Sequence, residues 1–226
     1  MNKEFTKSNN FIAFTIAEIL IVLGIVGIIA EITIPMLIKD TEKQIAITKV
    51  KQIYSILTQA NNSLNAECSG NALSCLSNIN AADDNQAIRT ELANLYKTKF
   101  SIMKDCTTGT PNDCFANVTY KGLDNNNDIN IATTSYLTYS AMVLKNGTSI
   151  CFDWDGANYS PRYFRIIVDL NNVKLPNQYG KDTFWFEYDY NKRTIVPWRS
   201  GLDCTSGNSG RSCSRNIILE NAINYY

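Results

Sequence analysis

The chain has 226 residues, and its 21 lysines and arginines balance its 21 aspartates and glutamates. A neutral chain with scattered basic residues does not predict a general electrostatic grip on nucleic acid, so no nucleic acid partner is expected. The sequence contains no histidine, which excludes Ser-His-Asp catalysis and mixed Cys/His zinc sites.

The first predicted element is an apolar helix over residues 14–38, long enough to cross a bilayer. Its only ionisable side chains are Glu18 and Glu31. A carboxyl group near the bilayer centre costs ~2.5–3.5 kcal/mol on insertion scales, so Glu18 needs a partner. Residues 1–13 form a short polar leader whose lysines should stay on the cytoplasmic side.

Cleavage after Ala13 would give Phe14 a free amine, which is a cation that Glu18 lacks. Within one helix this amine and the Glu18 carboxylate lie about one turn apart and meet imperfectly. Between two axially offset helices, the amine of one subunit can reach the carboxylate of its neighbour. Such a pair would set the register of the two helices, although both charges must be desolvated.

These residues resemble the type IV pilin and type II secretion pseudopilin family. The shared pattern is a short basic leader, a small residue (Ala13), then Phe14, Thr15 and, four residues after the phenylalanine, Glu18. The family usually has glycine where this chain has Ala13. Pro35 also falls where members often place a proline. The resemblance extends from about residue 11 to residue 60.

The resemblance implies cleavage between Ala13 and Phe14 by a prepilin peptidase, which also methylates the Phe14 amine. It implies storage in the inner (cytoplasmic) membrane with the C-terminal head outside the cytoplasm. Glu18 would neutralise the amine of an adjacent homologous subunit. Assembly would depend on an inner-membrane platform protein and a cytoplasmic ATPase. The chain would then be a structural filament subunit and not an enzyme.

Two other interpretations of the apolar run remain open. An ordinary secretory signal peptide would need a small-x-small cleavage site after its apolar core, and residues 28–30, Ile-Ile-Ala, make a poor one. A plain single-pass anchor with an accidental glutamate is the second.

A second helical pattern follows the apolar run. One apolar stripe recurs at steps of four and three residues, at Ala46, Val50, Ile53, Leu57, Ala60 and Leu64. We therefore predict one long helix from Phe14 to about Asn65, kinked at Pro35. Residues 39–226 form one head domain, which begins with the second half of this helix, residues 39–65.

Residues 66–115 form a polar connection with one predicted helix, about residues 83–99, capped by Asp83 or Asp84. Residues 116–226 form a sheet and a C-terminal loop with a short packing helix. Runs rich in β-branched and aromatic residues predict strands at 136–144, 148–152, 163–170, 183–190 and 193–196. Asn146-Gly147 is a hairpin signal. The predicted fold class is α+β, pilin-like, with the long helix packed on an antiparallel sheet.

Seven cysteines in an exported head predict disulfides and at least one unpaired thiol. Neighbouring cysteines close small loops in the pairs Cys68–Cys75, Cys106–Cys114 and Cys204–Cys213, which leaves Cys151 over. Seven cysteines permit other pairings, and a metal cluster is the rival, although no CxxC pair occurs.

The segment between the strands at 163–170 and 183–190 resembles a recurring pattern of pseudopilin heads. Turn geometry with side-chain hydrogen bonds to the backbone is its simpler role. Several pseudopilin heads bind calcium, and here Asp169, Asn171 and Asp182 are weak candidates for oxygen ligands. A second acidic string at 124–130 begins like an EF-hand loop, but Ile129 and Ser135 stand where a glycine and a closing acid are needed.

The leading hypothesis is a structural subunit of a type II secretion pseudopilus or a type IV pilus-like filament. The alternative is a minor pilin that displays its head for adhesion, DNA uptake or cargo, with Arg162, Tyr163 and Arg165 as a weak start for DNA. An anchored hydrolase that uses Asp153 and Asp155 is a third hypothesis, although a turn after a strand explains this pair more simply.

Overall fold

The computed structural model describes residues 15–77, 86–109, 111–126, 128–134, 137, 139–154, 164–198 and 204–226. The chain divides into two compact units, residues 1–42 and residues 43–226. We call the second unit the head. Helix α1 (Ile16–Glu67) contributes to both units and continues through Pro35. The long helix expected from the sequence is therefore present. The predicted Asp83 or Asp84 cap falls outside the described residues.

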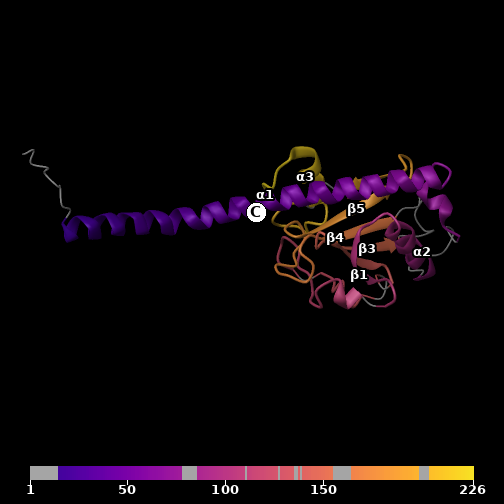
Figure 1. The fold of residues 1–226 in the computed structure, drawn as a ribbon, viewed down its shortest axis with the longest axis horizontal. Helices are drawn as coiled ribbons and strands as arrows, with labels where there is room; N and C mark the ends of the chain where they lie inside the picture. Colours follow the sequence, from indigo (N-terminus) through magenta and orange to yellow (C-terminus); the bar gives the residue numbers. More distant parts are fainter. Residues whose placement is uncertain are drawn as a thin grey trace, which may run out of the picture. The chain divides into compact units, whose positions relative to one another are not determined.

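The head part of α1 buries one stripe of side chains. This stripe contains Val50, Ile53, Leu57 and Leu64, each fully shielded from solvent. They pack in one cluster with aromatic and aliphatic side chains of a sheet, and the Tyr54 ring stacks on Phe186 with 5.9 Å between centroids. Figure 1 shows this part of the helix lying along one face of the sheet.

The sheet has six strands, all antiparallel, in the order β1-β2-β3-β4-β5-β6. Its strands are β1 (Ile102–Cys106), β2 (Ala141–Leu144), β3 (Ser149–Trp154), β4 (Phe164–Asp169), β5 (Thr183–Asp189) and β6 (Thr194–Pro197). Consecutive strands pair throughout. The expectation of an α+β fold with a long helix packed on an antiparallel sheet is confirmed.

The predicted strand at 136–144 is too long, because among the described residues of this segment Ala141–Leu144 are the ones that form a strand. Tyr139 has a left-handed backbone with a φ of 64°, which ends the strand on its N-terminal side. Strand β1 was not predicted. It is an edge strand whose Met103 side chain is 60% exposed, so it lacks the apolar pattern of the central strands.

Both faces of the sheet are covered. Phe152, Ile166 and Phe186 are aligned across β3, β4 and β5 and belong to the cluster with α1. Cys151, Ile167 and Trp185 are aligned one position along the same strands, so their side chains lie on the opposite face of the sheet. They belong to a second buried cluster. Residues of the connection 111–137 complete this cluster, among them Phe115, Tyr120, Ile131 and Leu137. This double burial explains why the central strands read as nearly continuous apolar runs.

The remaining helices are short. They are η1 (Ala72–Cys75), α2 (Gln86–Lys97), η2 (Pro111–Asp113) and α3 (Cys213–Glu220). α2 packs against the sheet through Tyr96, whose ring lies 5.1 Å from Phe152. After α3, Tyr225 is buried and its hydroxyl donates to the Gly180 carbonyl at 2.8 Å. The chain end is thus docked on the head.

Three disulfides fasten the head. They join Cys68 with Cys75, Cys106 with Cys114 and Cys204 with Cys213, which are the pairs expected from sequence proximity. Cys151 is the free cysteine and is fully buried on β3. Burial raises the pKa of its thiol well above 9.0, so the thiol stays protonated.

Candidate functional site

The exposed apolar part of α1 is the first candidate site. Every described residue from Thr15 to Glu42 is exposed except Ala30, which is half-buried. This stretch belongs to α1, which is the one helix among the described residues that is long and apolar enough to cross a membrane. A side chain built at Gly24 or Gly27 would meet no other atom of the chain. The surface at these glycines is therefore open to another helix or to lipid.

Glu18 lies at the start of this helix and takes part in a capping box with Thr15. Its Oε2 accepts hydrogen bonds from the Thr15 amide and the Thr15 hydroxyl, both at 2.8 Å. The Glu18 amide in turn donates to the Thr15 hydroxyl oxygen at 3.3 Å. This reciprocal pattern satisfies donors at a helix N-terminus. The sequence contains this T-x-x-E signature, but Thr15 was not predicted to hold Glu18. Ala13 and Phe14 lie outside the described residues.

The loop between β4 and β5 is the second candidate site. Asp182 accepts hydrogen bonds from the backbone amides of Asn177 and Gln178, both at 2.8 Å. Asp169 accepts from the Asn171 amide at 3.0 Å and from the Tyr120 hydroxyl at 2.8 Å. The role expected for this segment, turn geometry held by side-chain hydrogen bonds to the backbone, is present.

The loop also holds oxygen atoms that suit a hard cation. The Oδ1 atoms of Asn171, Asn172 and Asn177 are buried and have no hydrogen-bond partner. Burial and the nearby Asp182 raise the pKa of Asp169 well above 3.8, and burial also raises the pKa of Asp182. No group of three or more histidine, cysteine, aspartate or glutamate ligands occurs among the described residues. Two carboxylates and three amide oxygens nevertheless fit calcium by ligand chemistry.

A row of charges crosses the sheet on the face opposite α1. Asp153, Arg165 and Glu187 are aligned on β3, β4 and β5. The Arg165 guanidinium contacts the Asp153 carboxylate at 2.8 Å and lies 5.6 Å and 5.7 Å from the ring centroids of Trp185 and Trp198. The ion pair gives Asp153 a structural role. Asp155 and the other two proposed DNA contacts, Arg162 and Tyr163, fall outside the described residues.

The acidic string at 124–130 does not converge on one point. Asp124 accepts from the Asn126 amide at 3.0 Å, which is a local turn. Asp128 instead binds Arg211, whose Nε lies 3.0 Å from its carboxylate. The Asn130 side-chain oxygen accepts a hydrogen bond from the Ala132 amide, which closes a local turn. These carboxylates therefore serve local and long-range structure.

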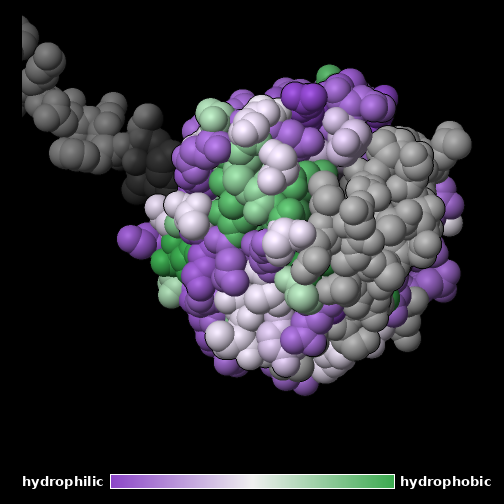
Figure 2. Space-filling view, turned by 90° about the vertical axis from the view of Figure 1, so that its right-hand side faces the viewer, coloured by the Kyte–Doolittle hydropathy of each residue, from purple (hydrophilic) through white to green (hydrophobic). Residues whose placement is uncertain are grey.

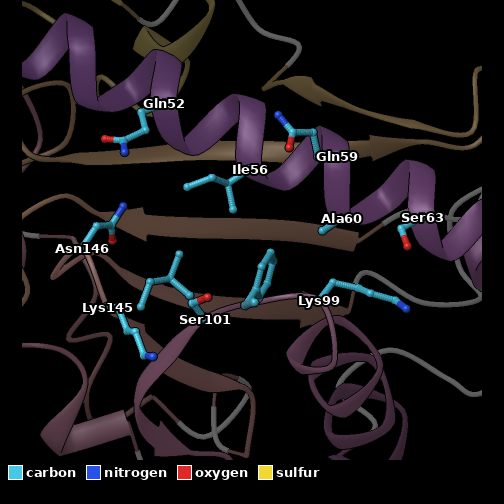
Figure 3. A pocket seen from close by; sticks show the side chains of 11 residues that line it. Gln52, Ile56, Gln59, Ala60, Ser63, Lys99, Ser101, Lys145 and Asn146 are labelled. Carbon is cyan, nitrogen blue, oxygen red and sulfur yellow. The ribbon is translucent and has the colours of Figure 1, made fainter.

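A shallow groove of about 440 Å³ lies in the head between α1 and the turn that joins β2 to β3. Figure 3 shows Ile56 pointing into it from α1, with Gln52 and Gln59 beside it, while the amino groups of Lys99 and Lys145 point away. The described residues that line it include neither an acid nor a cysteine. Its polar lining consists of amide, hydroxyl and ammonium groups.

The surface of the head contrasts with that of the apolar helix. In the face that Figure 2 shows, hydrophilic residues cover most of the described surface, and hydrophobic residues gather in a smaller area. The large apolar side chains exposed in the first unit are numerous and recur from Ile16 to Ile38. No family model, no curated protein and no solved structure matches this chain.

Proposed function

We propose that this chain is a structural subunit of a type II secretion pseudopilus or a type IV pilus-like filament. In this proposal, prepilin peptidase cuts between Ala13 and Phe14 and methylates the new amine, and subunits polymerise through the N-terminal half of α1. The subunit itself carries out no chemistry. Before assembly it resides in the inner membrane with its head outside the cytoplasm.

The observation that carries the proposal is the solvent exposure of residues 16–38 beside the burial of the head stripe of the same helix. An apolar surface of this extent requires lipid or other apolar helices around it. Lipid covers it in a stored subunit, and neighbouring helices cover it in a filament. The inner-membrane platform protein and the assembly ATPase would supply the work of extraction.

Glu18 supports the filament more than a plain anchor. Its carboxylate is held at the helix start by Thr15, and in this proposal it meets the amine of an adjacent subunit. Glu31 is a second exposed carboxylate in the same apolar helix. It therefore provides an internal control for the presence of charge alone.

The first experiment determines the mature N-terminus by mass spectrometry, in cells with and without prepilin peptidase. We expect a peptidase-dependent start at Phe14 that is heavier by one methyl group. In the same cells, Glu18→Ala should abolish filament assembly while Glu31→Ala retains it. An intact leader in both strains would overturn the proposal and leave a simple anchored head.

A minor pilin whose head binds DNA, cargo or a surface is the second candidate function. Within the described residues, the groove beside Ile56 gives it a place to bind a partner. A low ratio of this chain to the main subunit in purified filaments, together with filament formation in its absence, would favour this role.

Calcium is a further part of the proposal and concerns the head alone. Asp169, Asn171 and Asp182 would hold the ion, with Asn172 and Asn177 as additional oxygen donors. Bound calcium would neutralise two buried carboxylates and fix the loop between β4 and β5. Calorimetric titration of the calcium-free protein with calcium tests this, with Asp169→Asn expected to abolish the heat of binding.

A further inference from the structure

The loop between β4 and β5 exposes two apolar side chains although its backbone is tightly held. Leu175 is 80% exposed and Val173 is 50% exposed. Two hydrogen bonds hold the loop around these side chains. The Asn171 side chain donates to the Leu175 carbonyl at 3.0 Å, and the Asn177 amide donates to the Asp182 carboxylate. Because these bonds fix the loop, its apolar tip is held outward and cannot fold back onto the head.

Cationic side chains accompany this apolar tip. Lys174 stands between Val173 and Leu175 and is exposed. Lys181, at the other end of the loop, places its Nζ 5.1 Å from the ring centroid of Tyr226. Tyr226 is itself 43% exposed. Leucine and tyrosine flanked by lysine is the composition that proteins place at the boundary between lipid tails and headgroups.

This surface lies beside the first turns of the head part of α1. The Lys49 ammonium donates to the Leu170 carbonyl at 3.3 Å. The Lys43 ammonium lies 5.0 Å from the Tyr226 ring centroid. Figure 1 marks the C-terminus beside α1. The loop and the chain end are therefore both anchored to residues 43–49.

Chain connectivity places residues 43–49 close to the proposed membrane span. Lys43 is only five residues beyond Ile38, where the apolar run ends. Five residues extend at most about 18 Å, and the headgroup region on one side of the hydrocarbon core is roughly 5–7.5 Å thick. The loop that contacts these turns is thus joined to the proposed span through a short segment of chain.

The charges around the surface favour anionic headgroups. Lys43, Lys49, Lys174 and Lys181 are its cations in the head, whereas the acids of the loop, Asp169 and Asp182, are buried. Lysine ammonium groups close to an anionic bilayer surface are attracted to its headgroups. The apolar tip supplies contacts that do not depend on salt.

We propose that Val173, Lys174, Leu175 and Tyr226 form a membrane-docking surface, which seats the head of the unassembled subunit on a bilayer containing anionic lipid. This inference depends on α1 spanning a membrane, and not on filament assembly. Docking would fix the orientation of the stored head. Extraction into a filament would then require the loop to leave the lipid.

The test uses the full chain in vesicles of phosphatidylcholine with or without phosphatidylglycerol. A polarity-sensitive fluorophore is attached at Leu175→Cys, and the native chain, whose free Cys151 is buried, gives the labelling background. We expect a blue-shifted emission and strong quenching by brominated lipid, both larger with phosphatidylglycerol. Lys174→Glu in the labelled protein should remove that lipid dependence.

Two further label positions make every outcome informative. Tyr190→Cys is a matched exposed apolar site at the other end of the head. Its neighbour Arg193 accepts hydrogen bonds from Asn61 and Asn65, which lie at least 12 residues along α1 from Lys49. The label at Tyr190→Cys should therefore stay exposed to water. Val22→Cys reports on the span. Quenching at Val22 without quenching at Leu175 overturns the docking surface. No quenching at Val22 overturns the membrane span itself.

A second copy of this chain is the rival occupant of the surface. If Leu175 is shielded only in assembled filaments and remains water-exposed in vesicles that hold single subunits, the surface is a subunit contact and the proposal is wrong. Circular dichroism and thermal unfolding of each labelled protein, compared with the native chain, show whether the head is folded in all variants.

Discussion

The two halves of α1 belong to one continuous helix but differ in the arrangement of their apolar residues and in their surroundings. From Ile16 to Ile38 apolar residues occur around the whole circumference, and none is buried. From Ala46 to Leu64 they form one stripe, and that stripe is buried against the sheet. The difference teaches that an apolar stripe on one side of a helix finds its partners within the head, whereas apolar residues on all sides leave the first half exposed in the described structure.

The largest expected effect comes from truncating the buried stripe. Ile53→Ala should destabilise the head by about 2–5 kcal/mol, because it removes packed methyl groups and leaves a cavity. The matched change Ile28→Ala, at a side chain 63% exposed, should leave head stability unchanged. Urea unfolding of the full chain in detergent, followed by tryptophan fluorescence, measures both. Equal effects of the two changes would contradict the contrast between the halves.

The end of the head helix should depend on its disulfide. Cys68 follows α1 directly and is joined to Cys75 through a short loop. Replacing both cysteines with serine should cost about 2–4 kcal/mol, because the unfolded chain regains the freedom of that loop. The same denaturant titration measures the loss. An unchanged midpoint would mean that the surrounding hydrogen bonds hold this turn without the covalent link.

A smaller loss of stability is expected when the hydrogen bond of the one polar residue in the buried stripe is removed. Asn61 is fully buried, accepts from the Tyr96 hydroxyl at 2.7 Å and donates to the Arg193 carbonyl at 2.9 Å. Tyr96→Phe would leave the Asn61 carbonyl oxygen without this donor and should cost about 1–3 kcal/mol. Tyr54→Phe is the control, because the Tyr54 hydroxyl makes only a long contact of 3.4 Å. Similar losses in both variants would argue against the buried hydrogen bond.

Periodicity predicted much of this arrangement. The steps of four and three between Ala46 and Leu64 predicted the buried stripe, because helical geometry alone puts these positions on one side. The β-branched and aromatic runs predicted five of the six strands. The Asn146-Gly147 turn joins β2 and β3 as expected, with Gly147 at a φ of 83°.

Other features depended on contacts between distant residues. The second buried face requires Tyr120 to reach Asp169, which are 49 positions apart, and no local pattern indicates such a pair. Strand β1 is an edge strand that pairs with β2, and most of its residues are exposed. Its sequence therefore lacks the apolar pattern by which the central strands were predicted. The Thr15–Glu18 capping box is a local signature, but the apolar sequence around Glu18 predicted a partner in another subunit instead.

The smallest expected effect is a pH dependence that separates the calcium loop from the rest of the head. Burial raises the pKa of Asp169 and Asp182 above 3.8, so the folded head retains protons that the unfolded chain has released. Without calcium, this pair should therefore lower stability as pH rises from about 4 through the raised pKa values, after which its contribution is constant. Asp169→Asn should flatten that decline, whereas Asp113→Asn, at an exposed carboxylate, should leave it unchanged.

Calcium should reverse this trend, because the ion binds the ionised carboxylates and stabilises the folded state by mass action. The gain in melting temperature from added calcium should therefore be small at acidic pH and larger at neutral pH. Melting curves of the full chain across this range, with a chelator or with calcium, measure both slopes. If calcium leaves the neutral-pH melting temperature unchanged while Asp169→Asn still flattens the decline, the two carboxylates are purely structural. The loop that carries Leu175 would then owe its fixed shape to hydrogen bonds alone.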